Sequence, residues 1–152
     1  MDYAIKSLIS ELLQNSIQEF LMGYATGISL DFSTSRATFR EFGRGLPFES
    51  VLRPEERTIK EALNITSNLY LCSFRDGYCI WGQYSNGKLV EKGLIDTTEP
   101  NGFLIRFWPD EELFLDATFD MEVVSKIVKD CMDSFPGLNV TFRVSKPDTS
   151  TD

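Results

Sequence analysis

The sequence contains no histidine and has a deficit of positive charge. Without histidine, this chain cannot build a Ser-His-Asp triad, a Cys-His pair, a His-ligated zinc site or a His general base. Lys and Arg together number 15 and Asp and Glu 23, so the net charge is −8, which opposes contacts with nucleic-acid phosphates. Any catalysis is therefore expected to use carboxylates, amides, hydroxyls or metal-bound water, and no direct nucleic-acid partner is expected.

Cysteines and long apolar runs are also scarce. Cys72, Cys79 and Cys131 are an odd number without CxxC spacing, so neither a disulfide framework nor a zinc knuckle is indicated. We interpret them as buried apolar residues in a reducing compartment. No apolar run approaches the ~20 residues that a membrane span needs, and acidic and amide residues interrupt the N-terminal apolar stretch, unlike a signal peptide. The sequence predicts a cytoplasmic protein with no membrane partner.

The residues that are present are typical of one globular domain. The chain has 152 residues, of which 42% are hydrophobic and 12% aromatic, and this length supports a single core. We find no internal repeat and no domain linker. The domain is expected to span residues 1–145, followed by a flexible polar tail over 146–152.

Hydrophobic spacing predicts the order of the elements. Asp76-Gly77 and Asn86-Gly87 occupy hairpin positions, where a positive φ is needed. The expected elements are a helix over 5–21 that ends at Gly23, a strand hairpin over 28–32 and 37–42, a loop to Pro54, a helix over 55–66, strands over 68–74, 78–85, 88–95 and 102–108, a helix over 120–135 and a strand over 138–144. This order predicts an α+β two-layer sandwich, with helices on one face of a mostly antiparallel sheet.

Three polar residues step across the first helix toward its apolar side. Glu11, Asn15 and Glu19 are spaced by four residues, and Glu19 lies within the apolar arc. A carboxylate there is costly unless it is paired or faces a cavity, which marks Glu19 as a functional candidate. The alternatives are that Glu19 reaches water from the helix end, and that Glu11 and Asn15 form an ordinary solvated helix edge.

A second cluster follows the strand over 37–42. Glu41 stands at the strand end, and Gly43 and Gly45 follow it with one residue between them. Glycines let the backbone approach a ligand, and a carboxylate can accept a hydrogen bond from an amino group. A plain strand-to-loop turn is the alternative interpretation.

The two clusters together resemble a known family. The stretch from Glu11 to Glu19, then Gly23-Tyr24-Ala25, then Gly43-Arg44-Gly45-Leu46-Pro47, resembles the N-terminal ATPase domain of the DNA gyrase B and topoisomerase IV B subunits. That family belongs to the GHKL superfamily, whose nucleotide-binding domain has the Bergerat fold. The resemblance covers about residues 5–145 and resumes at Asn68-Leu69-Tyr70, Phe74-Arg75-Asp76-Gly77 and Arg106-Phe107-Trp108-Pro109.

The resemblance implies a role for each matching residue. It implies that Glu11 is the general base for the attacking water and that Asn15 is the ligand of Mg²⁺, which suits the chemistry of a carboxylate and of an amide oxygen. The other implied nucleotide-binding residues are Glu19 on the pocket wall, Glu41 at the adenine amino group, Gly43 and Gly45 of the glycine motif, and Arg44, Pro47 and Arg75 at the pocket mouth.

Several positions depart from the family pattern. Glu41 replaces an Asp, Phe103 replaces a Thr beside the adenine, and Gln14 replaces the Asp before the metal-binding Asn. The glycine-rich ATP lid is missing, because only residues 48–55 separate Pro47 from the second helix and Glu56-Arg57-Thr58 stand in place of glycines. The triphosphate site therefore lacks its main anion nest. The family's second domain, which supplies a lysine to the γ-phosphate, lies outside these 152 residues, so strand passage by this chain alone is not expected.

Three functional hypotheses follow from these departures. The first is a degenerate gyrase-B-like ATPase domain, a pseudoenzyme with weak or no binding of ATP, ADP and Mg²⁺ and little or no hydrolysis. The second is a minimal Mg-dependent ATPase, favoured by Glu11 and Asn15. The third is a protein-interaction module for a gyrase or topoisomerase subunit or for a second copy of the chain, favoured if Tyr78, Trp81 and Tyr84 are exposed rather than packed in the core.

Overall fold

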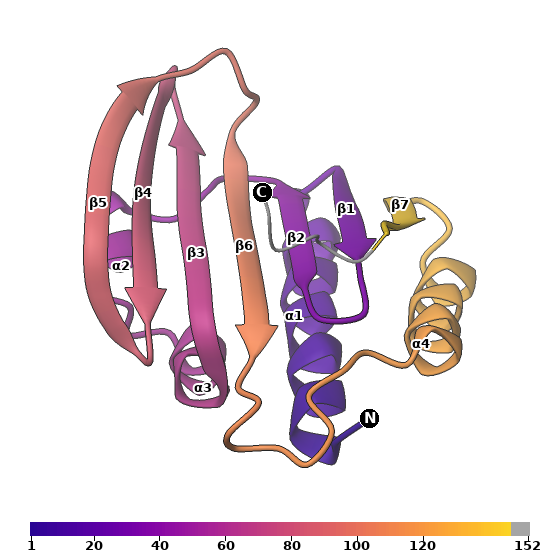
Figure 1. Cartoon of the computed structure of the whole chain (residues 1–152). Coiled ribbons are helices and arrows are strands. Elements are labelled where there is room, and N and C mark those ends of the chain that lie inside the picture. The colour runs from indigo at the N-terminus through magenta and orange to yellow at the C-terminus, as the bar shows by residue number, and fades with distance from the viewer. Residues whose placement is uncertain (147–152) are drawn as a thin grey trace.

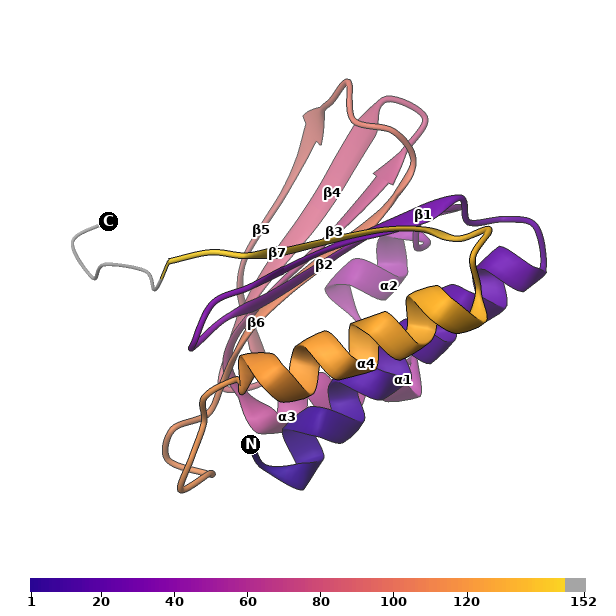
Figure 2. The same cartoon turned by 90° about the vertical axis from the view of Figure 1, so that its right-hand side faces the viewer.

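Seven strands of the described residues form one sheet in the order β5-β4-β3-β6-β2-β1-β7, and the helices cover one face of it (Figures 1 and 2). β1 and β7 pair in parallel, and the other pairs are antiparallel. The computed structural model describes residues 1–146, so all but the first residue of the predicted tail over 146–152 lies outside the described residues. The predicted α+β two-layer sandwich is confirmed.

The boundaries agree closely with the sequence pattern. The elements are α1 (Tyr3–Leu21), β1 (Gly27–Phe32), β2 (Ala37–Phe42), α2 (Phe48–Leu52), α3 (Arg57–Ile65), β3 (Thr66–Arg75), β4 (Tyr78–Ser85), β5 (Lys88–Asp96), β6 (Gly102–Pro109), α4 (Met121–Ser134) and β7 (Asn139–Val144). Among residues 1–146, no helix is both long enough and apolar enough to cross a membrane.

The core lies between α1 and the sheet. The Asp2 side chain caps the start of α1 by accepting from the Ala4 N–H, and Gly23 (φ 85°) follows its end. The apolar arc of α1 packs against large side chains of β1, β2 and β6, among them the fully buried Phe32, Phe39 and Phe107. This packing fixes the rotation of α1 about its axis, and with it the direction of its polar residues.

Two tight turns connect β3, β4 and β5 as the sequence predicted. Asp76 (φ 53°) and Gly77 (φ 88°) connect β3 to β4, and Asn86 (φ 49°) and Gly87 (φ 81°) connect β4 to β5. Consecutive positive φ angles are the geometry of a two-residue hairpin, which these residue pairs tolerate.

The predicted loop after Pro47 contains a short helix instead. Residues Phe48–Leu52 form α2, and Val51 is fully buried beneath β4. The Tyr84 hydroxyl donates to the Val51 carbonyl and holds this segment against the sheet. The prediction of a loop was therefore wrong. It failed because five residues are too few to show a helical period in the sequence.

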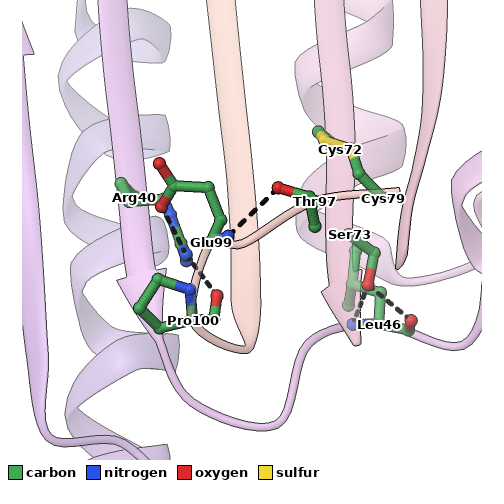
Figure 3. The surroundings of a disulfide bond; sticks show 8 residues. All are labelled: Arg40, Leu46, Cys72, Ser73, Cys79, Thr97, Glu99 and Pro100. Atoms are coloured by element: carbon green, nitrogen blue, oxygen red, sulfur yellow. Dashed lines mark hydrogen bonds and ion pairs between the residues drawn. A yellow bond between two sulfur atoms is a disulfide. The ribbon is translucent and has the colours of Figure 1, made fainter. Parts of the chain in front are cut away.

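The interpretation of the cysteines also needs correction. All three are buried as expected, but Cys72 and Cys79 form a disulfide on the sheet face that lies away from the helices (Figure 3). Cys72 pairs with Trp81, and Cys79 pairs with Phe74, so the two cysteines lie diagonally across the β3–β4 hairpin. A search for CxxC spacing misses such a pair, because the proximity comes from strand register. Cys131 is free.

Candidate functional site

The polar residues of α1 lie along the side that faces α3 and the end of β2. Asn15 and Glu11 contact α3, while Glu19 contacts the loop that follows β2. Glu41 lies on the same face of the sheet as α1, because its carboxyl group hydrogen-bonds with Ser16 of that helix. The structure therefore brings the helix residues and Glu41 to one side of the sheet.

The first turn of α3 packs directly on Glu11 and Asn15. The Asn15 side-chain amide donates to the Thr58 hydroxyl (Nδ2 to Oγ1, 3.1 Å), and Thr58 is only 2% exposed. The Arg57 guanidinium forms an ion pair with Glu11 (Nη2 to Oε1, 3.3 Å). Both residues expected to act on Mg-ATP thus have partners within this chain.

The carboxyl group of Glu61 adds negative charge beside Glu11. Interaction with the carboxyl of Glu61 on α3, together with burial, raises the pKa of Glu11, and the Arg57 guanidinium lowers it. Arg57 also lies 3.7 Å from Glu61 (Nη1 to Oε1), so one guanidinium serves both acids. The Glu11 Oε2 atom is buried without a hydrogen-bond partner among the described residues. Glu11 is therefore engaged by α3 rather than free beside a water, which does not suit a general base.

Glu41 is the most buried acid of the site, at 4% exposed. It pairs across the sheet with Phe103 of β6, so the two residues predicted beside the adenine are cross-strand neighbours. Burial raises the pKa of Glu41, and the charge of Glu19 adds to this, while Ser16, Arg40 and Arg44 lower it. Burial is the largest of these effects, so the proton is held more tightly in the folded chain than in the unfolded one.

The raised pKa of Glu41 makes a prediction about stability. Below the ordinary glutamate pKa the side chain is neutral in both states, and as pH rises through the raised value the folded state must bury a charge and loses stability. Relative to the native chain, the stability of Glu41→Gln should therefore gain on the order of 1 kcal/mol as pH rises from below the ordinary glutamate pKa to above the raised value. Urea unfolding across this range measures the gain, with the exposed Glu111→Gln as control. An equal response of both variants to pH would contradict the assignment.

Glu19 and Arg44 form an ion pair at the end of α1. One Arg44 nitrogen lies 2.7 Å and 3.0 Å from the two Glu19 oxygens, and the guanidinium stacks on Tyr24 at 3.8 Å from the ring centre. Glu19 therefore neither stands unpaired in the core nor simply reaches water. The pair connects α1 to the loop after β2.

The glycine loop is held close to the sheet. Gly45 has a positive φ of 77°. A Cβ at this position would lie against the Gly102 and Phe74 carbonyls and the Arg75 side chain, so no larger residue fits there. The Leu46 N–H donates to the Ser73 hydroxyl, and this hydroxyl donates to the Leu46 carbonyl (Figure 3). Arg75 thus lies beside this loop, and the exposed Pro47 is the N-cap residue of α2.

Several residues that build the site were not predicted from the sequence. Ser16 and Ser73 are small buried hydroxyls on otherwise apolar faces, and Thr58 and Glu61 belong to a helix to which no chemistry was assigned. The polar identity of Ser16 and Ser73 at core positions is the one signal in the sequence that could have identified them.

Two concavities lie elsewhere on the molecule. One of about 900 Å³ is lined by Trp108 and the loop over 110–118, and one of about 210 Å³ is lined by Tyr70, Arg106 and Trp108. Neither includes any of the residues predicted to bind nucleotide.

The residues present do not fit Mg-ATP as they stand. Asn15 is hydrogen-bonded to Thr58, and Glu11 is ion-paired with Arg57. The N-terminus of α3 is capped by the Glu56 carboxylate, which accepts from the Ile59 N–H. A helix N-terminus that already binds a carboxylate is a poor phosphate site, because the donors are engaged and the added charge is repulsive.

The fold and site define an α+β domain in which a Glu-x-x-x-Asn helix faces a strand-borne acid and a glycine loop. No family model matches the sequence. The chain is 28% identical to the B subunit of DNA topoisomerase 4 from Borreliella burgdorferi, over 75% of this chain and 22% of that protein. It is 23% identical to the DNA gyrase B subunit of Campylobacter jejuni, over 90% of this chain and 22% of that protein, and 24% identical to the gyrase B subunit of Thermotoga maritima, over 89% and 26%.

The chain is therefore similar to one part of the B subunits of DNA gyrase and DNA topoisomerase 4, and its sequence diverges from theirs. The similarity extends over most of this chain in several B subunits, and the fold agrees with it. The chain spans about a quarter of the length of these curated relatives.

Proposed function

We propose that this chain is a gyrase-B-like domain whose nucleotide site no longer hydrolyses ATP and binds ATP or ADP weakly or not at all. The observation that carries the proposal is the contact of α3 with α1, in which Arg57 and Thr58 engage Glu11 and Asn15. In this arrangement the base and the metal ligand implied by the resemblance are used to hold two helices together.

The electrostatics of the phosphate end support the same proposal. The carboxylates of Glu11, Glu56 and Glu61 gather near the start of α3, where a triphosphate would need cationic or N–H donors. Arg57 at this helix start is already paired with two of the acids, Glu11 and Glu61. A nucleotide would have to displace these pairs, which lowers its net affinity.

The adenine end supports weak binding as well. Glu41 is buried with a raised pKa, and Phe103 places a half-buried ring in the strand beside it. Glu41 is already hydrogen-bonded with Ser16, and the Phe103 ring supplies no hydroxyl to share a water with the adenine. Any residual adenine site would be held by shape more than by polar contacts.

An interaction module on the same scaffold is the second candidate. Tyr84 is 3% exposed and Trp81 is half-buried, so these two aromatics pack rather than display a surface. Tyr78 is 49% exposed, and the neighbouring strand β5 is exposed along its length. The exposed apolar residues therefore favour a partner at this edge, independently of the nucleotide site.

The proposed loss of nucleotide function makes a quantitative prediction. Calorimetric titration of the full chain with ADP and with a non-hydrolysable ATP analogue, with and without Mg²⁺, should give dissociation constants no tighter than roughly 100 µM. The missing phosphate donors and the altered adenine contacts each cost on the order of 1–3 kcal/mol. Phe103→Thr combined with Glu41→Asp should tighten binding at least about threefold. Nanomolar binding by the native chain would overturn the proposal.

A further inference from the structure

β5 is an edge strand with an unusually open side. It ends the sheet order, and all its residues except Gly93 are exposed, including Val90 at 58%, Leu94 at 57% and Ile95 at 56%. Figure 1 shows β5 at the border of the sheet, with no helix or strand of the described residues along its outer side. Native proteins usually protect such an edge with prolines, inward-pointing charges or a covering segment, because its free backbone groups can pair with another chain.

The register of β5 determines which backbone groups point outward. The Thr97 N–H donates to the Gly77 carbonyl of the β4 side at 2.9 Å. Backbone groups alternate along an antiparallel strand, so the N–H and C=O groups of Lys92, Leu94 and Asp96 face away from β4. The irregularity opposite Gln83 and Tyr84 limits the straight part of the free edge to residues 91–96.

We propose that β5 pairs antiparallel with β5 of a second copy of this chain, about a two-fold axis at Leu94. This register places Leu94 opposite Leu94 of the second copy, with both backbones exchanging N–H to O=C bonds. It also places Lys92 opposite Asp96 of the second copy and, by symmetry, Asp96 opposite Lys92. All of these residues have outward-facing backbone groups, so the pairing uses donors and acceptors that no described strand of the chain itself engages.

The side chains in this register are complementary. The side chains of Lys92, Leu94 and Asp96 lie on one face of β5. Their partners on β4 are the alternate residues Gly82, Ile80 and Tyr78. Two Lys–Asp pairs would therefore flank a central Leu–Leu contact on that face. The pairing removes the exposed Leu94 side chain from water and matches opposite charges in spite of the overall charge of −8.

The opposite face is complementary in shape. The same register places Ile95 of the second copy opposite Gly93. The Trp81 ring lies against Gly93 and fills the space that a side chain at position 93 would occupy. Ile95 of the second copy would thus pack over the edge of Trp81, which belongs to the apolar cluster around Cys72, Phe74 and Cys79. A glycine covered by a neighbouring aromatic ring is a known way to stabilise a strand pair.

Sedimentation equilibrium of the full chain tests the pairing. At about 0.15 M salt, the mass should rise with concentration from 17.3 kDa toward twice that value between about 10 µM and 1 mM, since a short strand pair is a small interface. Leu94→Pro removes an outward N–H without breaking a bond to β4, and it should weaken association at least about tenfold. Lys92→Glu places like charges opposite one another and should have a similar effect.

Two further variants test this register specifically. Lys92→Glu combined with Asp96→Lys exchanges the charges and should restore association to within about threefold of the native value. Lys6→Glu makes the same charge change on exposed α1 and should leave association unchanged. A mass of 17.3 kDa at every concentration would overturn the proposal. A dimer that is indifferent to Leu94→Pro, or one that the double exchange fails to restore, would also overturn it.

Discussion

Gly102→Ala is expected to destabilise the domain by about 3–5 kcal/mol, the largest effect of a single methyl group in this chain. Gly102 begins β6 with φ at 144°, a conformation that other residues rarely adopt. A Cβ there would overlap the Glu41 carbonyl and the Arg40 guanidinium. Both contacts are with β2, at Arg40 and at Glu41 of the candidate site, so the backbone of β2 or β6 would have to move.

Gly77→Ala is the matched control for this prediction. Gly77 also has a positive φ, at 88°, but no atom lies within 4 Å of its added Cβ. Its cost should be limited to the conformational strain, about 1 kcal/mol. Urea unfolding of the two variants separates strain from steric overlap. Equal losses of stability would show that β6 does not approach β2 as closely as described.

Arg40→Ala is expected to cost about 3 kcal/mol or more. Arg40 is 8% exposed and lies between the rings of Phe42 and Phe74, with its Cζ 4.3 Å from each ring centre. Its guanidinium donates to the Glu41 carbonyl. It also donates to the Pro100 carbonyl and pairs with Glu99 at 3.6 Å (Figure 3). Truncation would leave buried acceptors unpaired and would release the segment between β5 and β6.

Arg40→Lys distinguishes the guanidinium fork from the charge alone. Lysine keeps the charge but cannot stack between two rings while donating in two directions. It should retain about half of the stability that Arg40→Ala loses. Thermal unfolding and limited proteolysis at residues 97–101 measure both effects. A lysine variant as stable as the native chain would show that the planar contacts contribute nothing.

The fold could be predicted from the sequence wherever one local signal dominated. The Asp76-Gly77 and Asn86-Gly87 turns fixed two hairpins, because few residue pairs adopt two consecutive positive φ angles. The spacing of apolar residues in α1 predicted which face of this helix is buried. The helix α2 and the Cys72–Cys79 disulfide were missed, because one is too short to show a period and the other depends on strand register.

The candidate site could be predicted only in part. The spacing of Glu11, Asn15 and Glu19 correctly placed them on one side of α1, and Glu41 faces the same helix. The sequence did not indicate that Arg57 and Thr58 contact Glu11 and Asn15. That contact depends on how α3 packs after the shortened connection, a tertiary property that no local pattern encodes.

Phosphate release at millimolar Mg-ATP tests the central claim most directly. Hydrolysis needs a base, a bound metal and charge stabilisation around the γ-phosphoryl group in a closed site. In this chain Glu11 is paired with Arg57, and Asn15 is bonded to Thr58. We therefore expect the purified chain to release phosphate no faster than its Glu11→Ala variant. Release that is clearly above that variant and is abolished by removing Mg²⁺ would contradict the account and would establish a working minimal ATPase.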